Sequence, residues 1–243
     1  MSTEKIFSIL DLYSEKKTHL SVAEISNLLD VPQSSVYRHV RVLKENGFLI
    51  ETDRGEYQLG YRFIDFANIV RLDNSLSKIS LSYMKDLTND LGETTILSVL
   101  SDMYAVCLET VSSMRPVKVS SEQGKIMPLY TGASSKAILA YQSQELVDQL
   151  FVKGMVKKYT ESTLATREDL VANLNEIQEV GYATSDGEID EGVISYGVPI
   201  RDSKQQVFAS LAIAGPRERM LKINKDEIVM KLRNAVTNIE KYL

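Results

Sequence analysis

Hydrogen-bonding and cationic side chains crowd residues 33–41, where the chain reads QSSVYRHVR. Hydroxyl, amide and guanidinium groups are the ones that contact base edges and phosphates in DNA. Val36, Val40 and Leu43 fall at helical spacing and define an inward face on the other side. We therefore predict a DNA-recognition helix over about 33–46, with contact residues Gln33, Ser34, Ser35, Tyr37, Arg38 and Arg41. The alternative is a helical hairpin whose polar face is only solvated.

A second helix should precede this one and hold it in place. Ser21 and Glu24 have capping-box spacing, which predicts a helix start, and apolar residues follow at helical intervals. Asp30 tolerates a left-handed turn and Pro32 disfavours helical geometry in the residue before it, so the helix should end there. This order predicts a helix-turn-helix, with a further helix at residues 4–14 packed beneath it.

A short hairpin should follow the recognition helix. Residues 48–52 and 56–59 have strand-like patterns, and Asp53-Arg54-Gly55 between them is typical of a turn. A hairpin in this position predicts a winged helix-turn-helix, with Arg54 at the wing tip beside the DNA phosphates. An ordinary hairpin is the alternative.

The net charge of the chain is not that of a typical DNA-binding protein. The formal value is −5 at pH 7, and residues 1–60 carry seven Lys and Arg against nine Asp and Glu. Because a DNA-binding surface is usually basic, the positive charge must be concentrated on one face of this acidic chain. That face is formed by Arg38, Arg41, Lys44 and Arg54. We expect modest non-specific affinity with a strong salt dependence.

The residue types do not support an enzyme or a membrane protein. Cys107 is the single cysteine, which excludes an internal disulfide, and its apolar surroundings favour a small core residue over a nucleophile. His19 and His39 are isolated, and we find neither a nucleophile–base pair nor metal-ligand spacing, so we predict no catalytic residues, metal site or cofactor. Without a bilayer-spanning apolar run or a signal-peptide core, we expect a cytoplasmic protein with no membrane partner.

Residues 61–74 predict a linker helix. Its apolar surface exceeds what one contact with its own domain needs, and it is carried by Phe63, Ile64, Ala67, Ile69, Val70 and Leu72. We predict that this surface pairs with a second copy, because winged-helix proteins often bind two half-sites as dimers. Packing onto its own domain is the alternative.

From residue 75 the pattern changes to strands at hairpin spacing mixed with helices, which predicts an α+β domain with an antiparallel sheet. The expected strands cover 94–100, 104–108, 117–119, 182–185, 195–200 and 207–214. The expected helices cover 76–91, 134–141, 143–151, 167–179 and 225–242. The predicted domains are therefore 1–60 for DNA binding, 61–74 as the linker and 75–243 for a second function.

Two stretches of the second domain could bind a small molecule. In residues 129–137, Gly132 precedes small and hydroxyl residues at a helix start, where free backbone N–H groups favour an anion. A plain capped helix is the alternative there. In residues 181–202, a loop between strands contains four acidic residues, Asp186, Glu188, Asp190 and Glu191. A solvated acidic loop is the alternative there.

Several motifs, taken in order, resemble the IclR family of bacterial transcriptional regulators from about residue 4 to residue 241. They are SVAEISNLLDVPQSSVYRHVRVLKENGFL, GEYQLG, LYTGASSKAILA, GYATSDGEIDEGVISYGVPIRD and FASLAIAGP. The fourth is the most specific, because its matching positions are Gly181, Glu188, Ser195, Gly197 and Asp202. Tyr196 and Arg201 depart from the choices usual in the family.

The resemblance implies a winged helix domain, a linker helix and a GAF/PAS-like effector domain. Such proteins are usually dimers or tetramers that repress or activate operons, and a small organic acid often modulates them. The polar residues predicted at 33–38 match the positions of the family's recognition helix.

The resemblance also marks effector positions, namely Leu129, Tyr130, Gly132, Ala133, Ser185, Ser195, Ala212 and Ala214. The backbone amides of residues 132 and 133 match a loop that holds a carboxylate, and the two serines match polar pocket positions. Residues 212 and 214 are serines in members that bind very small keto acids, so the alanines here imply a larger or less polar acid. Leu129 and Tyr130 could line such a pocket.

The sequence thus predicts a transcriptional regulator that binds double-stranded operator DNA as a homodimer, or as a dimer of dimers, under the control of a small organic acid. A ligand would act by favouring one spacing of the two recognition helices over another. The alternatives are an enzyme with an accessory DNA-binding domain and a DNA-binding oligomer whose second domain serves only for assembly.

Overall fold

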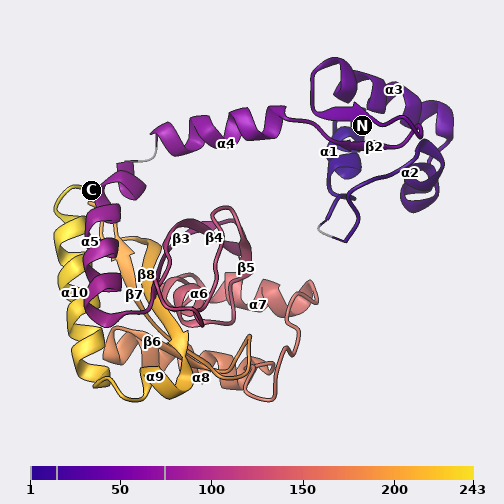
Figure 1. Cartoon of the computed structure of the whole chain (residues 1–243). Helices are drawn as coiled ribbons and strands as arrows, with labels where there is room; N and C mark the ends of the chain where they lie inside the picture. Colours follow the sequence, from indigo (N-terminus) through magenta and orange to yellow (C-terminus); the bar gives the residue numbers. More distant parts are fainter. Residues whose placement is uncertain (1, 15, 74) are drawn as a thin grey trace. The chain divides into compact units, whose positions relative to one another are not determined.

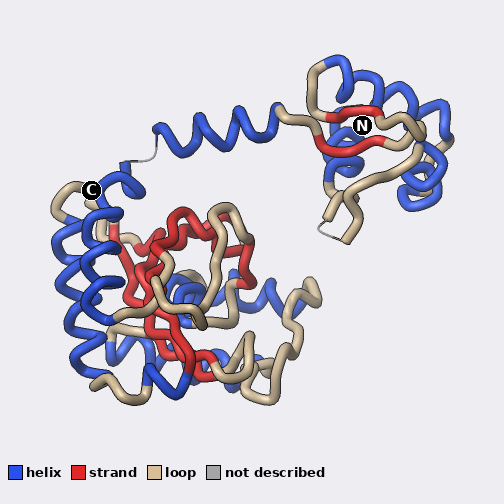
Figure 2. Tube along the Cα trace, viewed as in Figure 1, coloured by secondary structure: helices blue, strands red, loops and turns tan. Residues whose placement is uncertain are grey.

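The computed structural model describes residues 2–14, 16–73 and 75–243 (Figures 1 and 2). The chain divides into two compact units, Met1–Asn74 and Ser75–Leu243. Asn74, the last residue of the expected linker, lies outside the described residues. Among the described residues, no helix is both long enough and apolar enough to cross a membrane.

Three helices form the core of the first unit: α1 (Ser2–Leu10), α2 (Val22–Leu29) and α3 (Gln33–Glu45). The predicted capping box begins α2, since the Ser21 hydroxyl accepts from Glu24 N at 3.3 Å and the Glu24 carboxylate accepts from Ser21 N at 2.8 Å. Asp30 ends α2 in the left-handed conformation, with φ of 51°. Helix α1 ends earlier than predicted because residues 11–13 turn away through short-range backbone hydrogen bonds.

The wing and the linker helix complete this unit. Strands β1 (Leu49–Glu51) and β2 (Tyr57–Leu59) pair antiparallel, as predicted, and α4 (Arg62–Asp73) follows. Gly60 lets the chain cross itself closely, because a Cβ there would stand 2.0 Å from the Gly47 carbonyl oxygen. Phe48 packs against Phe63 of α4 with ring centroids 5.4 Å apart, which attaches the start of α4 to the wing.

The second unit is built on a six-stranded antiparallel sheet in the order β5-β4-β3-β8-β7-β6. Its strands are β3 (Thr94–Ser101), β4 (Tyr104–Val111), β5 (Ile126–Pro128), β6 (Ala183–Asp186), β7 (Val193–Arg201) and β8 (Val207–Pro216). Its helices are α5 (Ser75–Leu91), α6 (Ala133–Leu139), α7 (Gln144–Val152), α8 (Arg167–Val180), α9 (Arg217–Met220) and α10 (Lys225–Glu240). The predicted α+β class is therefore correct.

Helices cover both faces of this sheet (Figure 1). Helices α5 and α10 pack on one face, against alternate strand residues such as Leu97, Ile194 and Leu211. Helices α6, α7 and α8 form a separate core on the other side. Because side chains alternate along a strand, the residues between those of the first core face α6.

One predicted strand is wrong. Residues 117–119 are not a strand, and the third strand of the meander is β5 at Ile126–Pro128, which pairs with β4. The carbonyl groups of residues 117 and 119 accept hydrogen bonds from side chains and not from a neighbouring strand. Arg219 donates to Val117 O and Thr94 donates to Val119 O, each at 2.8 Å. The alternating valines therefore reflect an anchored loop. The short helix α9 was not predicted.

Candidate functional site

Helix α3 has the two faces that the sequence predicted. Val36, Val40 and Leu43 are buried against the other helices of the unit. Ser35 is half-buried, and five predicted contact residues are exposed: Gln33, Ser34, Tyr37, Arg38 and Arg41. The Tyr37 side chain is 59% exposed, and Val42 beyond it is exposed too, so the outward face offers apolar as well as polar groups. Val42 was missed because a single valine outside the core spacing gave no signal.

Two of the four basic residues on the expected DNA face have acidic partners. Arg41 Nε donates to Glu45 at 2.7 Å, and Lys44 Nζ donates to Glu51 at 2.5 Å. Such exposed pairs contribute little free energy, so a phosphate can compete for these cations. Arg38 and Arg54 form no ion pair within the described residues, and Arg54 is exposed in the wing turn. The unpaired positive charge is therefore concentrated on these two arginines.

His39 is buried on the inner side of α3. Burial lowers the pKa of its imidazole, and the charges of Arg38 and Lys5 act in the same direction. The ring is therefore neutral at pH 7 and belongs to the packing that holds the recognition helix.

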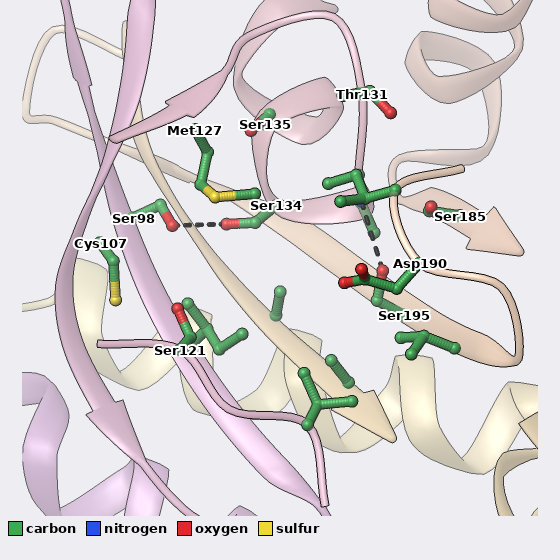
Figure 3. A pocket seen from close by; sticks show the side chains of 18 of the residues that line it. Ser98, Cys107, Ser121, Met127, Thr131, Ser134, Ser135, Ser185, Asp190 and Ser195 are labelled. Carbon is green, nitrogen blue, oxygen red and sulfur yellow. Dashed lines mark hydrogen bonds between the residues drawn. The ribbon is translucent and has the colours of Figure 1, made fainter. Parts of the chain in front are cut away.

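A cavity lies in the second unit on the sheet face that α6 covers, and Figure 3 shows its polar side chains. Its volume is about 110 Å³, enough for a small organic molecule. The floor comes from β3, β7 and β8, and two loops, 112–125 and 187–192, form the walls. Six of the predicted effector residues line it: Gly132, Ala133, Ser185, Ser195, Ala212 and Ala214.

Strand register explains why residues far apart in sequence meet at this floor. Ala214 of β8 lies opposite Ser195 of β7, and Ala212 lies opposite both Gly197 of β7 and Ile96 of β3. Gly197 lets α6 approach the sheet, because a Cβ there would stand 2.6 Å from the carbonyl oxygen of Ala133. The start of α6 therefore rests directly on the strand that carries Ser195.

Three serines join α6 to the floor of the cavity. The Ser134 hydroxyl lies 2.7 Å from the Ser98 hydroxyl (Figure 3). It also lies 2.9 Å from the Ser210 hydroxyl, and Ser210 donates to Ser134 O at 2.8 Å. Ser98 and Ser210 were missed, although the alternation of their strands could have placed them on this face.

The amides expected to hold a ligand carboxylate have intrachain acceptors. Gly132 N donates to Glu188 Oε2 at 3.0 Å, and Ala133 N makes a long hydrogen bond of 3.4 Å to Ser195 Oγ. A ligand carboxylate would have to displace these groups. Residues 132 and 133 line the cavity, but their hydrogen-bonding capacity is already used.

Glu188 belongs to a buried ion pair with Lys136 of α6. The Lys136 side chain is inaccessible to solvent and also donates to Asn173 Oδ1 and Thr184 O, both at 2.9 Å. Burial lowers the pKa of the Lys136 ammonium, and the adjacent carboxylate opposes this effect. Loop 187–192 is thus fixed to the helix that covers the cavity. The alternative of a solvated acidic loop is wrong for Glu188, which is only 6% exposed, whereas Asp186, Asp190 and Glu191 are exposed.

Leu129 and Tyr130 do not line the cavity, which corrects the expectation for these two residues. Both are buried in the core between α6, α7 and α8. The Tyr130 hydroxyl donates to Lys157 O at 2.8 Å, and burial raises its pKa to about 12. These two side chains therefore pack among the helices on the same side of the sheet and do not reach the cavity.

Cys107 lines the cavity from β4 and is buried. Burial raises the pKa of its thiol, which leaves it protonated and a poor nucleophile at pH 7. Within the described residues, no cluster of three or more His, Cys, Asp and Glu side chains could hold a metal ion.

Comparison with known proteins identifies the class of the molecule. The IclR helix-turn-helix domain matches residues 2–53, and the domain described as "Bacterial transcriptional regulator IclR C-terminal" matches residues 71–241. The class is therefore that of bacterial transcriptional regulators. Within it, the chain belongs to the IclR family, which confirms the resemblance and the predicted fold class.

Curated relatives and solved structures agree with this assignment. The chain is 26% identical to the regulator KipR of Bacillus subtilis over 98% of its own length and 94% of that protein, and 27% identical to KdgR of Escherichia coli over 98% and 90%. A crystal structure of a putative IclR regulator from a Silicibacter species is 26% identical, with a TM-score of 0.85 over 100% of this chain and 96% of that one. An IclR homologue from Microbacterium hydrocarbonoxydans, complexed with 4-hydroxybenzoate, shares the fold at 23% identity and a TM-score of 0.79, over 99% of this chain and 98% of that one. The relatives are transcriptional regulators, not enzymes.

Proposed function

We propose that this protein acts in the cytoplasm as a transcriptional regulator whose affinity for operator DNA is changed by a small organic acid in the cavity of the second unit. The observation that carries the DNA-binding part is the exposed face of α3, where Arg38 has no acidic partner within the described residues. A helix of this width fits the major groove, and an arginine there can bind guanine through two hydrogen bonds.

The test is Arg38→Ala, measured by fluorescence anisotropy on the DNA upstream of the protein's own gene and on scrambled DNA. If Arg38 binds a base, specific binding weakens by about 1–3 kcal/mol while scrambled DNA is little affected. Lys204→Ala removes an exposed charge from the turn before β8 and serves as the control. Unchanged specific affinity of the Arg38 variant would show that another face of the unit contacts DNA.

The effector part of the proposal rests on the cavity and its free hydroxyl groups. Ser185 is buried at the cavity wall, and no group within the described residues hydrogen-bonds to its hydroxyl. The hydroxyl oxygen is accessible from the cavity, so it is available to hydrogen-bond a ligand. The relative complexed with 4-hydroxybenzoate supports an organic acid as the class of ligand. Gly132, Ala133 and Ser195 would contact it, with Ala212 and Ala214 beneath.

We also propose that α4 pairs with a second copy of the chain. Ile69 and Val70 are 59% and 60% exposed, and Ile64 and Tyr61 are exposed as well. Burial of such side chains between copies is favourable and would join two DNA-binding units. Ile69→Glu should lower the molar mass measured by light scattering, whereas Asp65→Ala should leave it unchanged. An unaltered mass for Ile69→Glu would place the interface elsewhere.

A regulator without a small ligand is the competing function, and the occupied amides of residues 132 and 133 favour it. In that case the second unit would serve for assembly. Binding of any small acid that changes operator affinity would exclude this alternative.

A further inference from the structure

The side of α3 that bears the predicted DNA contacts carries an exposed aromatic ring. Tyr37 is 59% exposed, and its hydroxyl group forms no hydrogen bond within the described residues. The side chains of Val36, Val40 and Leu43 are instead buried on the other side of the helix. The ring of Tyr37 therefore stands outside the core of the first unit and is available to contact another molecule.

This ring lies beside the polar groups of α3, on the side that faces the wing. Ser34 and Arg41, three residues before Tyr37 and four residues after it, are its neighbours on the helix surface, and both are exposed. Lys44 lies two turns beyond Tyr37 on the same side, and its Nζ donates to Glu51 of β1 at 2.5 Å. A base edge that Ser34 or Arg41 contacts would therefore lie close to the ring as well.

Thymine is the base whose edge matches an apolar ring. In the major groove, base edges present hydrogen-bond donors and acceptors, and the C5 methyl group of thymine is the apolar group among them. Cytosine in the same place presents the donor of its amino group and no methyl group. A DNA phosphate would use the hydroxyl group of Tyr37 alone and would leave the ring exposed to water.

We propose that Tyr37 selects a thymine in the operator by packing its ring against the C5 methyl group. This inference rests on the proposed function, because it requires α3 to enter the major groove. Tyr37 and Arg38 are consecutive, so their Cα atoms are about 3.8 Å apart, and successive base pairs are about 3.4 Å apart. The thymine therefore lies within about two base pairs of the guanine that Arg38 binds.

The test removes one methyl group at a time from the DNA. A preferred duplex is selected from random DNA with the full-length protein, and each of its thymines is then replaced by uracil, which lacks the C5 methyl group. Replacing each guanine by 7-deazaguanine, which lacks the N7 acceptor, locates the base that Arg38 binds. Fluorescence anisotropy should show a thymine close to that guanine where uracil weakens binding about four-fold, as expected for burying one methyl group.

Three variants assign this thymine preference, which is the ratio of the dissociation constants for the uracil and thymine duplexes. Tyr37→Ala should bring the ratio close to one, and Tyr37→Phe, which keeps the ring, should leave it unchanged. Val42→Ala is the matched control, because it shortens an exposed apolar side chain on a different side of α3. This control should also leave the thymine preference unchanged.

Three results would overturn the proposal. They are a selected duplex in which no uracil weakens binding, a thymine preference that persists in Tyr37→Ala, and a Tyr37→Phe variant that binds as weakly as Tyr37→Ala. The last result would assign the contact to the hydroxyl group and a phosphate. A selected duplex without a thymine preference would refute this inference alone, whereas selection that yields no preferred sequence would refute the proposed function together with it.

Discussion

Replacing Lys136 with methionine should destabilise the second unit by about 3–5 kcal/mol, because the change leaves a buried carboxylate without its cation. Lys136 is inaccessible to solvent, and Glu188 is 6% exposed. The ammonium also donates to Asn173 Oδ1 and Thr184 O at 2.9 Å, so methionine removes three hydrogen bonds at once. The remaining donors to Glu188, from Thr131 and Gly132, do not neutralise its charge.

Urea denaturation followed by circular dichroism measures this loss. Lys136→Met, Glu188→Gln and the double variant form a double-mutant cycle. The loss in free energy of unfolding of the double variant should be smaller than the sum of the two single losses by about 0.5–3 kcal/mol. Lys158→Met breaks an exposed pair with Glu161 and should cost less than about 1 kcal/mol. If Lys136→Met costs no more than Lys158→Met, the buried pair does not fix loop 187–192 to α6, and this reasoning is refuted.

Three further predictions follow from the fold. Gly197→Ala should lower stability by about 1–3 kcal/mol and weaken ligand binding, because its Cβ meets the backbone of α6; a melting temperature like that of the unaltered protein would contradict the close approach. Since the pKa of His39 is lowered by burial, the unfolded state binds the proton more readily, so the first unit should lose stability as pH falls below about 6.5. Urea titrations at pH 7.5 and 5.0 should show a smaller loss of stability on acidification for His39→Leu than for the unaltered protein. Equal losses in the two proteins would exclude His39 as the cause. In the folded protein, Cys107 should react with a thiol reagent much more slowly than in protein unfolded by urea. A ligand bound in the cavity should slow the reaction further, and an equal rate with and without ligand would place the ligand elsewhere.

Local signals made the first unit predictable from sequence. The capping box of Ser21 and Glu24 lies within four consecutive residues, and the left-handed turn at Asp30 depends on that residue and the nearby Pro32. The wing follows from a turn between two short strands. Such features need no knowledge of distant parts of the chain, which explains why the structure reproduces them with shifts of only a residue or two at most element ends.

Long-range pairing limited what could be predicted of the cavity. Ser134 meets Ser98 and Ser210, which lie 36 and 76 positions away, and Lys136 meets Glu188 across 52 positions. The order of the strands brings them together, and no local pattern encodes that order. The loop containing residues 117–119 was mistaken for a strand because alternating valines look alike whether they join a ladder or are anchored by side chains.

The effector positions that the family resemblance implied on the sheet line the cavity, whereas Leu129 and Tyr130 before α6 do not. Ser185, Ser195, Ala212 and Ala214 all line the cavity, because strand register fixes which side chains face it. The resemblance could not show that Glu188 already occupies the amide of Gly132. That contact depends on the path of loop 187–192.

Binding of the full-length protein to its own upstream DNA and to scrambled DNA, measured by fluorescence anisotropy over a salt series, tests the central claim most directly. We predict tighter binding to its own sequence, with an affinity for both DNAs that falls steeply as salt rises. No binding to either DNA at low salt would contradict the claim that the exposed face of α3 and the wing form a DNA-binding surface.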